Sequence, residues 1–314
     1  MAVVKLSTSG LSNFAKYSSM LAGNAKYRIP GVAGYAAGGY SSGYVSTVDK
    51  FAFPSDSKST LATGLSAGTN DPGGMYNQNV AGYSGGGDSG SATAVVDKFT
   101  FPADTRTTLG TGLSVARLSP TGFSNSGTAG YIAGGGGGTV VDKFAFPTDS
   151  RTTLGTGLSV GRSALCGFSN TDVAGYAAGG SGFSAVVDKF AFPSDSRTTL
   201  ATGLSSARLG TAGMSNQTVA GYAAGGYTGS RVTTVDKFAF PSDTRTTLGT
   251  GLSSARMYIA GFSNSAVAGY SAGGSAAPVT SAVDKFAFPA DTRTTLGTGL
   301  TAAIEGPTGF QDAA

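Results

Sequence analysis

Residues 173–204 read VAGYAAGGSGFSAVVDKFAFPSDSRTTLATGL, and this stretch decides the fold because close copies of it recur along the chain. The string Val-Asp-Lys-Phe occurs six times at intervals of 45 to 48 residues, with its aspartate at Asp49, Asp97, Asp142, Asp188, Asp236 and Asp284. Ala-Gly-Tyr also occurs six times, ending at Tyr35, Tyr83, Tyr131, Tyr176, Tyr222 and Tyr270. A period of this length indicates either a propeller or a solenoid.

The contents of one unit predict four short strands. The first surrounds Phe168 in Gly-Phe-Ser-Asn, and the second is Val-Ala-Gly-Tyr-Ala-Ala-Gly-Gly. The third, Val-Asp-Lys-Phe-Ala-Phe, stops at Pro193, since proline has no N–H to donate to a sheet. The fourth is the Arg-Thr-Thr-Leu-Ala-Thr-Gly-Leu-Ser stretch that begins at Arg197. No segment has a helical apolar period, so six such units predict an all-β, six-bladed β-propeller.

The C-terminal end predicts how the ring closes. Leu300 and Phe310 are separated as Leu252 and Phe262 are, so the chain ends with a first strand that no second strand follows. We therefore expect residues 307–312 to complete the blade begun by residues 31–65. A rival assignment gives that place to residues 25–29, because Tyr27 precedes Ala33 by the expected offset. With closure by the C-terminal strand, the predicted domains are an N-terminal arm, residues 1–30, and a propeller, residues 31–314.

The composition argues against an enzyme. The chain has no His and one Cys, and its 17 acids include a single glutamate, Glu305. Catalysis by Ser-His-Asp or Cys-His groups is therefore excluded, as are His-ligated and Cys-cluster metal sites. We expect no catalytic residues, no metal and no cofactor, and a hydrolase or lyase is the least favoured class. No apolar run is long enough to span a bilayer.

The net charge of +4 does not come from the repeated positions. Each unit carries two acids and two bases at fixed positions, so the repeats are neutral. Lys5, Lys16, Lys26 and Arg28 lie in the first 30 residues, which contain no acid. Nucleic-acid binding needs clustered bases along a surface, so the sequence gives it little support.

The repeated Asp-Lys pair predicts contacts between blades. Adjacent residues on a strand point to opposite faces, so each Asp is expected to meet the Lys of the neighbouring blade. The structural inter-blade ring would comprise Asp49, Lys50, Asp97, Lys98, Asp142, Lys143, Asp188, Lys189, Asp236, Lys237, Asp284 and Lys285. A cation site formed by the six aspartates is the less favoured alternative, since a Lys accompanies every Asp.

Variation among the six units separates the two faces of the predicted disc. The turn between the third and fourth strands is nearly constant, whereas the 2–3 and 4–1 loops differ in every unit. Binding residues are commonly placed on loops held by a rigid scaffold. The candidate ligand-binding or receptor-binding residues are Tyr40, Tyr44, Phe183, Tyr227, Arg231 and Tyr258. Unselected drift of solvent-exposed loops would give the same pattern.

The constant turn supports a second class of function, a soluble bacterial lectin or adaptor. Six equivalent weak glycan sites could use one turn aspartate each and gain avidity on a repeated glycan. These residues are Asp56, Asp104, Asp149, Asp195, Asp243 and Asp291. The turn offers no aromatic platform for a sugar, so we expect these carboxylates to cap their own turns instead.

The units resemble the kelch repeat, in which a double glycine ends the second strand and an arginine lies near the unit boundary. Gly179–Gly180 and Arg162 illustrate the match, whereas the usual tryptophan of the fourth strand is absent. The repeats also resemble propeller proteins of tailed bacteriophages, and residues 14–24 are similar to attachment segments of phage tail and fibre proteins. This resemblance implies a noncatalytic virion protein of the tail, fibre or a decoration, cytoplasmic before assembly. Phe14, Tyr17, Met20 and Leu21 would anchor it to other virion proteins or sister chains, and the propeller would bind a host-surface glycan or protein.

Overall fold

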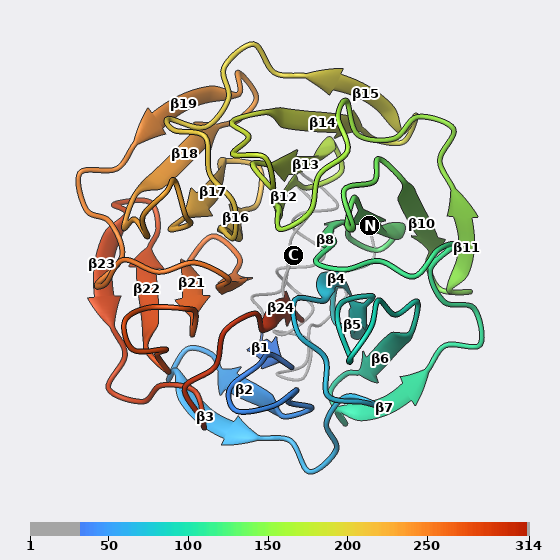
Figure 1. The fold of residues 1–314 in the computed structure, drawn as a ribbon, viewed down its shortest axis with the longest axis horizontal. Coiled ribbons are helices and arrows are strands. Elements are labelled where there is room, and N and C mark those ends of the chain that lie inside the picture. Colours follow the sequence, from blue (N-terminus) through green and yellow to red (C-terminus); the bar gives the residue numbers. More distant parts are fainter. Residues whose placement is uncertain (1–31, 313–314) are drawn as a thin grey trace, which may run out of the picture. The chain divides into compact units, whose positions relative to one another are not determined.

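Six four-stranded antiparallel sheets surround a central axis in the computed structural model, which describes residues 32–312. From the inner to the outer strand, the blades are β24-β1-β2-β3, β4-β5-β6-β7, β8-β9-β10-β11, β12-β13-β14-β15, β16-β17-β18-β19 and β20-β21-β22-β23. Figure 1 shows the blades in chain order around the ring. The fold is the predicted six-bladed β-propeller.

The strands repeat with closely matching bounds. The inner strands are β4 (Gly73–Asn77), β8 (Thr121–Asn125), β12 (Cys166–Asn170), β16 (Ala212–Asn216), β20 (Ala260–Asn264) and β24 (Thr308–Gln311). The second strands are β1 (Ala33–Ala37), β5 (Ala81–Gly85), β9 (Ala129–Ala133), β13 (Ala174–Ala178), β17 (Ala220–Ala224) and β21 (Ala268–Ala272). The third strands are β2 (Val48–Ala52), β6 (Val96–Thr100), β10 (Val141–Ala145), β14 (Val187–Ala191), β18 (Val235–Ala239) and β22 (Val283–Ala287). The outer strands are β3 (Ser57–Thr60), β7 (Thr105–Thr108), β11 (Ser150–Thr153), β15 (Ser196–Thr199), β19 (Thr244–Thr247) and β23 (Thr292–Thr295).

The outer strands are shorter than the sequence predicts. The fourth strand was expected to run through Leu-Ala-Thr-Gly-Leu, but β15 ends at Thr199. Beyond it, Leu200, Leu204 and Arg208 donate isolated backbone hydrogen bonds to Val187, Ala185 and Ser184, at or before the start of the third strand. Gly203 lies against the carbonyl of Ala185, where a Cβ would come within 2.1 Å. The chain therefore leaves the sheet edge and turns inward at this point.

The C-terminal strand closes the ring, as the sequence predicts. β24 pairs with β1 in the register Gly34↔Gln311 to Ala37↔Thr308, and β2 occupies the other edge of β1. Asp312 Oδ1 also accepts hydrogen bonds from the backbone N–H groups of Val32 and Ala33, at 2.6 and 2.9 Å. The inner place of the first blade thus belongs to residues 308–311, and not to residues 25–29.

Aromatic rings fill the spaces between blades. Phe168 of β12 stacks on Tyr176 of its own blade at 5.0 Å and on Phe238 of the next blade at 5.6 Å. It also lies flat on β17, where a Cβ at Gly221 would come within 2.0 Å of its ring. The glycine of Ala-Gly-Tyr therefore lets an aromatic ring of the preceding blade pack directly on the backbone. The hydrophobic core accordingly lies between neighbouring blades.

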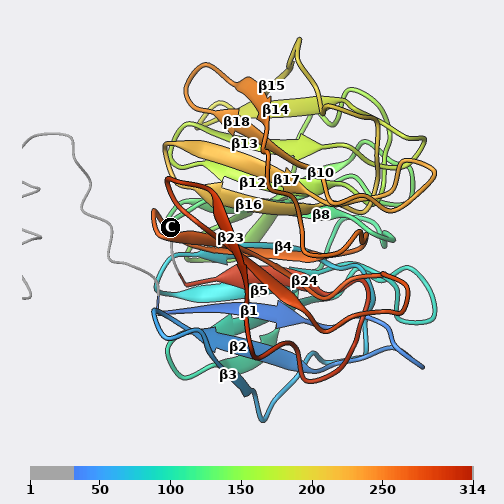
Figure 2. The ribbon, with the colours of Figure 1, turned by 90° about the vertical axis from the view of Figure 1, so that its left-hand side faces the viewer.

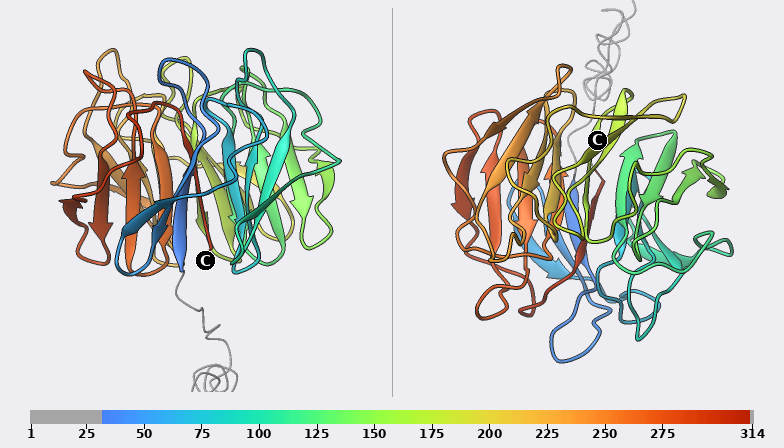
Figure 3. Two further views of the ribbon diagram at one scale, coloured as in Figure 1. Left: turned by 90° about the horizontal axis from the view of Figure 1, so that it is seen from below. Right: turned by 45° about the horizontal axis from the view of Figure 1, so that its top comes forward.

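The two faces of the disc carry different connections. Because the strands alternate in direction, the 2–3 and 4–1 loops lie on one face, which we call the loop face, and the 1–2 and 3–4 hairpins lie on the other, the turn face. Figures 2 and 3 show the longer loops gathered on one side of the disc and the short hairpins on the other. Within residues 32–312, no helix has the length and apolarity needed to cross a membrane.

Candidate binding face

The turn face is held by one contact that is repeated six times. Tyr131 donates a hydrogen bond to Asp195 Oδ1 at 2.7 Å, and Lys143 Nζ lies 2.6 Å from Asp195 Oδ2. Both donors belong to the third blade, while the aspartate lies in the turn of the fourth. Equivalent contacts join every neighbouring pair of blades, including Tyr270 and Lys285 with Asp56 across the ring closure. Both oxygens of each turn carboxylate are therefore engaged.

These contacts correct two predictions from the sequence. The lysine of Val-Asp-Lys pairs with the turn aspartate of the next blade, and not with the aspartate of the neighbouring Val-Asp-Lys. The turn aspartates bridge two blades instead of only capping their own turns. Their backbone has a positive φ, 57° at Asp195, which Asp adopts more readily than most residues. An aspartate serves both the turn conformation and the contact between blades.

The aspartate of Val-Asp-Lys is buried beneath the loop face and has different partners. Asp188 is fully buried and accepts hydrogen bonds from Thr199 and from both the N–H and hydroxyl of Ser159. It also forms an ion pair with Arg162, the boundary arginine, which is itself 1% exposed. Arg117, Arg208 and Arg256 pair in the same way with Asp142, Asp236 and Asp284. In the remaining two blades, Thr69 and Ile304 stand at the arginine position. Asp97 and Asp49 there accept hydrogen bonds from hydroxyl and N–H donors, and each pairs with a base of its own outer strand, Arg106 or Lys58.

The buried arginines hold the base of the 2–3 loops. Arg162 Nη1 donates to the carbonyls of Gly179 and Val186, each at 2.8 Å, and these residues flank the loop that carries Phe183. Breaking such a pair would leave a buried charge without compensation. In this chain, the boundary arginine therefore holds the two ends of a 2–3 loop together. The spacing of the motif along the sequence does not indicate this role.

A belt of backbone hydrogen bonds surrounds the central channel at the loop face. Its six members are the equivalent residues Asp71, Ser119, Ala164, Gly210, Tyr258 and Gly306, all with φ between 48° and 67°. In five of the six, the N–H bonds to the carbonyl of the neighbour across the blade boundary, for example Gly210 to Ala164 at 2.8 Å and Tyr258 to Gly210 at 2.7 Å. Between Asp71 and Ser119, the hydroxyl of Ser119 donates to the Asp71 carboxylate at 3.2 Å instead. The five backbone bonds use no side chain, so residues as different as Gly and Tyr can occupy the belt.

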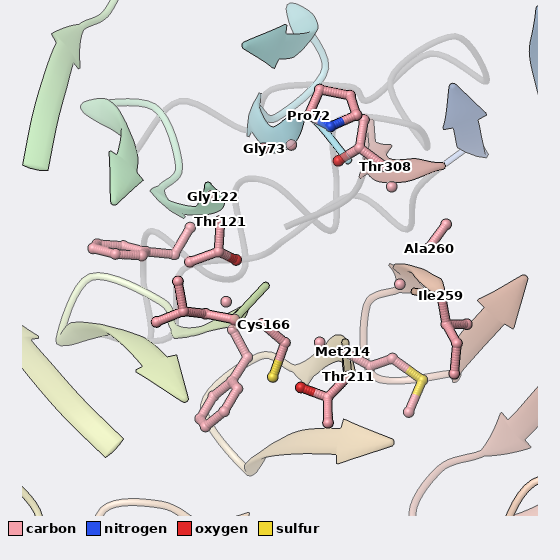
Figure 4. A pocket seen from close by; sticks show the side chains of 18 of the residues that line it. Pro72, Gly73, Thr121, Gly122, Cys166, Thr211, Met214, Ile259, Ala260 and Thr308 are labelled. Atoms are coloured by element: carbon pink, nitrogen blue, oxygen red, sulfur yellow. The ribbon is translucent and has the colours of Figure 1, made fainter. Parts of the chain in front are cut away.

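Below the belt lies a central cavity of about 100 Å³. Figure 4 shows Thr121, Cys166, Thr211 and Met214 around it. The second residues of the inner strands are glycines packed against one another, and a Cβ at Gly167 would come within 1.9 Å of the Gly122 carbonyl. Pockets for drug-sized ligands are roughly 300–1,000 Å³, so this space suits a few waters. Cys166 is a small buried residue, and its burial raises the pKa of its thiol to about 11.

A second ring on the loop face combines a constant backbone with varied side chains. Its positions follow the double glycine of each unit. The N–H of each residue donates to a carbonyl of the preceding 4–1 loop, and the six distances lie between 2.7 and 2.9 Å. We call this the variable ring, and its members are Tyr40, Asp88, Gly136, Ser181, Tyr227 and Ser275. The same backbone geometry thus carries two phenols, a carboxylate, two hydroxyls and a glycine.

The structure brings the sequence-predicted candidates into two groups. In the first blade, Tyr40 and Tyr44 are paired across their loop with ring centroids 5.3 Å apart. In the fourth and fifth blades, Phe183 and Tyr227 are 6.0 Å apart, and Arg231 faces Tyr227 across its own loop. Phe183 is 47% exposed at a φ of 50°, a conformation that bulky residues seldom adopt.

The sixth candidate, Tyr258, lies in the belt beside acids that the sequence analysis did not single out. Burial, together with the charges of Asp71 and Glu305, raises the pKa of Tyr258. The pKa of Asp71 rises to about 7, mainly because of burial and despite the hydrogen bond that it accepts from Ser119. Asp88 accepts a hydrogen bond from Tyr44 at 3.0 Å. In the described part of the chain, His, Cys, Asp and Glu nowhere gather in a group of three or more suited to a metal.

The arm residues Phe14, Tyr17, Met20 and Leu21 lie outside the described residues, so their anchoring role stays a prediction. Asp71, Asp88 and Glu305, which have no lysine or arginine partner within residues 32–312, were not predicted as site residues because they fall outside the repeated motif. Their signal in the sequence was this departure from the repeat.

The chain is similar to known proteins in fold but not in sequence. No protein-family model and no curated protein matches it. Among solved structures it is similar to the one titled "Structure of YjhT", with a TM-score of 0.64 and 15% sequence identity. The match covers 86% of this chain and 98% of that chain. A likeness at this level of identity shows the β-propeller fold alone.

Proposed function

We propose that the chain is a noncatalytic binding protein that recognises its target through the loop face. One observation carries this proposal: the variable ring repeats the same backbone hydrogen bonds six times, yet its side chains differ in chemistry. A backbone that needs no particular side chain leaves the side chains free to serve recognition. The exposed rings of Phe183 and Tyr44, 47% and 41% exposed, lie on the same face.

Following the resemblance to kelch-like propellers of tailed bacteriophages, we place this binding in a virion protein of the tail, the fibre or a decoration. The propeller would bind a protein or glycan of the host surface. The arm, residues 1–30, would attach the chain to other virion proteins or sister chains. The protein would lie in the cytoplasm before assembly and in the particle afterwards, without a nucleic-acid partner, a cofactor or insertion into a membrane.

The lectin alternative with six equivalent sites receives less support from the geometry. Each turn carboxylate already accepts a hydrogen bond from tyrosine and an ion pair from lysine. A sugar bound there would have to break a contact that holds two blades together. The side chains available for binding are on the opposite face, where no two blades are alike.

Binding of the labelled full-length chain to a panel of intact bacteria, measured by flow cytometry, tests the proposal. Substitution of Tyr44 and Phe183 by Ser should abolish binding, whereas Thr198→Ala on the exposed outer strand β15 should leave it unchanged. Replacing Phe14, Tyr17, Met20 and Leu21 by Ser should preserve cell binding but prevent incorporation into particles. Equal binding by the loop-face variant and the unaltered chain would refute the assignment of the binding face.

A further inference from the structure

Among the lysines and arginines of residues 32–312, one on the loop face has no acidic partner within that range. Of the 21 lysines and arginines in the chain, four precede residue 32. Sixteen of the remaining seventeen form an ion pair within residues 32–312. The exception is Arg231. In a protein that pairs its charges so consistently, an unpaired guanidinium indicates a site for an external anion.

Arg231 is also held in position. Its Nη2 donates to Ser275 Oγ at 3.1 Å, which fixes the side chain across the boundary between the fifth and sixth blades. Its Nε is buried without a hydrogen-bond partner, as in most arginines of residues 32–312, so this nitrogen does not face an external ligand. The remaining N–H groups of the two Nη nitrogens lie in one plane, the geometry that suits carboxylate, sulfate or phosphate groups.

An aromatic surface adjoins this guanidinium. Tyr227 is the direct cross-strand neighbour of Arg231, so their side chains project from the same face of the loop. Phe183 extends the surface into the fourth blade with its ring 6.0 Å from that of Tyr227. Phe183 keeps an unfavourable positive φ while it is nearly half exposed, a combination that strained functional residues show.

The surroundings select among anionic ligands. The backbone of Tyr227 is paired on both sides, with Leu209 and with Arg231, so no free edge remains to which a peptide strand could add. Asp88 and Glu305, which have no lysine or arginine partner in the described region, lie on the same loop face, and they would repel a polyanion such as a nucleic acid. What fits is a ring with an apolar face, hydroxyl groups and a single acidic substituent.

We propose that Phe183, Tyr227 and Arg231 bind an acidic saccharide unit. The sugar ring stacks on the two aromatic side chains, and its acidic group receives N–H donors from Arg231. This inference rests on the proposed function, because it names the ligand class for the same face. The site is single, since no other blade places an arginine opposite the variable ring.

The test applies the labelled full-length chain to an array that pairs carboxylated, sulfated and phosphorylated saccharides with their neutral parents. We expect at least one acidic saccharide to bind above its neutral parent. Calorimetry on that saccharide should show an affinity loss of about tenfold or more for Arg231→Gln and for Tyr227→Ala. Arg245→Gln removes the same charge from the outer strand of the same blade and serves as the matched control. Its affinity should equal that of the unaltered chain, and thermal unfolding should show that all variants fold.

Two results would overturn the inference: no acidic saccharide binding above its neutral parent, or full affinity in Arg231→Gln. The proposed function fails separately, through the cell-binding assay. The chain could bind cells, lose this binding on substitution of Phe183, and keep it in Arg231→Gln. In that case the loop face is the binding face, and the acidic saccharide is the wrong ligand.

Discussion

The turn face and the loop face are made from the same repeat, yet they differ in what their side chains must do. At the turn face, the tyrosine and lysine of each blade contact the turn aspartate of the next blade, so a change in one residue affects two blades. At the loop face, backbone groups bond to backbone groups in the belt and in the variable ring. Structure constrains the side chains on the first face and leaves them free on the second.

The largest expected effect concerns the support beneath the loop face. Asp188→Ala would leave Arg162 buried without its carboxylate, and we expect a loss of about 3–5 kcal/mol in the free energy of unfolding. Asp97→Ala is the matched control, because no boundary arginine contacts Asp97, and its cost should be about 1–3 kcal/mol. Urea unfolding followed by circular dichroism measures both. Equal losses would show that the buried arginines do not hold the loops as described.

A smaller effect is expected at the turn face. Asp195→Ala removes the acceptor of Tyr131 and Lys143, and because these groups are partly exposed, the cost should be about 1–2 kcal/mol. Cell binding should be unchanged, since the opposite face carries the proposed site. Ser194→Ala in the same turn is the control for local disturbance. A clear loss of cell binding by a folded Asp195→Ala protein would argue that the turn face takes part in recognition.

The pH dependence of stability distinguishes the two faces further. The folded-state pKa of Asp71 lies at about 7, above its ordinary value of 3.8, so the folded protein binds a proton that the unfolded chain has released between these values. Stability from this group therefore falls as the pH rises from about 4 to 7. Asp71→Asn should lose less stability than the unaltered chain between pH 5 and pH 8 in urea unfolding. Identical slopes for the two proteins would contradict the raised pKa.

The smallest effect on stability is expected at Phe183. Phe183→Asn relieves an unfavourable φ, which is worth about 1 kcal/mol, but loses the ring contact with Tyr227, which is worth about 0.5–1.5 kcal/mol. The net change in unfolding free energy should remain within about 0.5 kcal/mol. Binding should nevertheless be lost, because the exposed ring is gone. A destabilisation of several kcal/mol would instead mean that Phe183 is part of the core.

Several features of the fold could be predicted because they depend on local pattern and chain order. The six copies of Val-Asp-Lys-Phe set the number of blades, and the unmatched segment around Phe310 predicted the closing strand. The candidates Phe183, Tyr227 and Arg231 could be selected because they interrupt an otherwise constant repeat. Their proximity could not be predicted, since they come from two units and different positions within the 2–3 loops.

The sequence alone determined that the chain forms six equivalent blades, because apolar alternation and turn residues act within a few positions of one another. Only the tertiary structure decided the partner of each charge. Lys143 is about one repeat away from both Asp188 and Asp195, so spacing does not distinguish the two. The packing of one blade on the next places Asp195 at the lysine and gives Asp188 to the buried Arg162. The same packing leaves Arg231 without a carboxylate partner. Contacts between blades, and not distance along the chain, determine which charges pair.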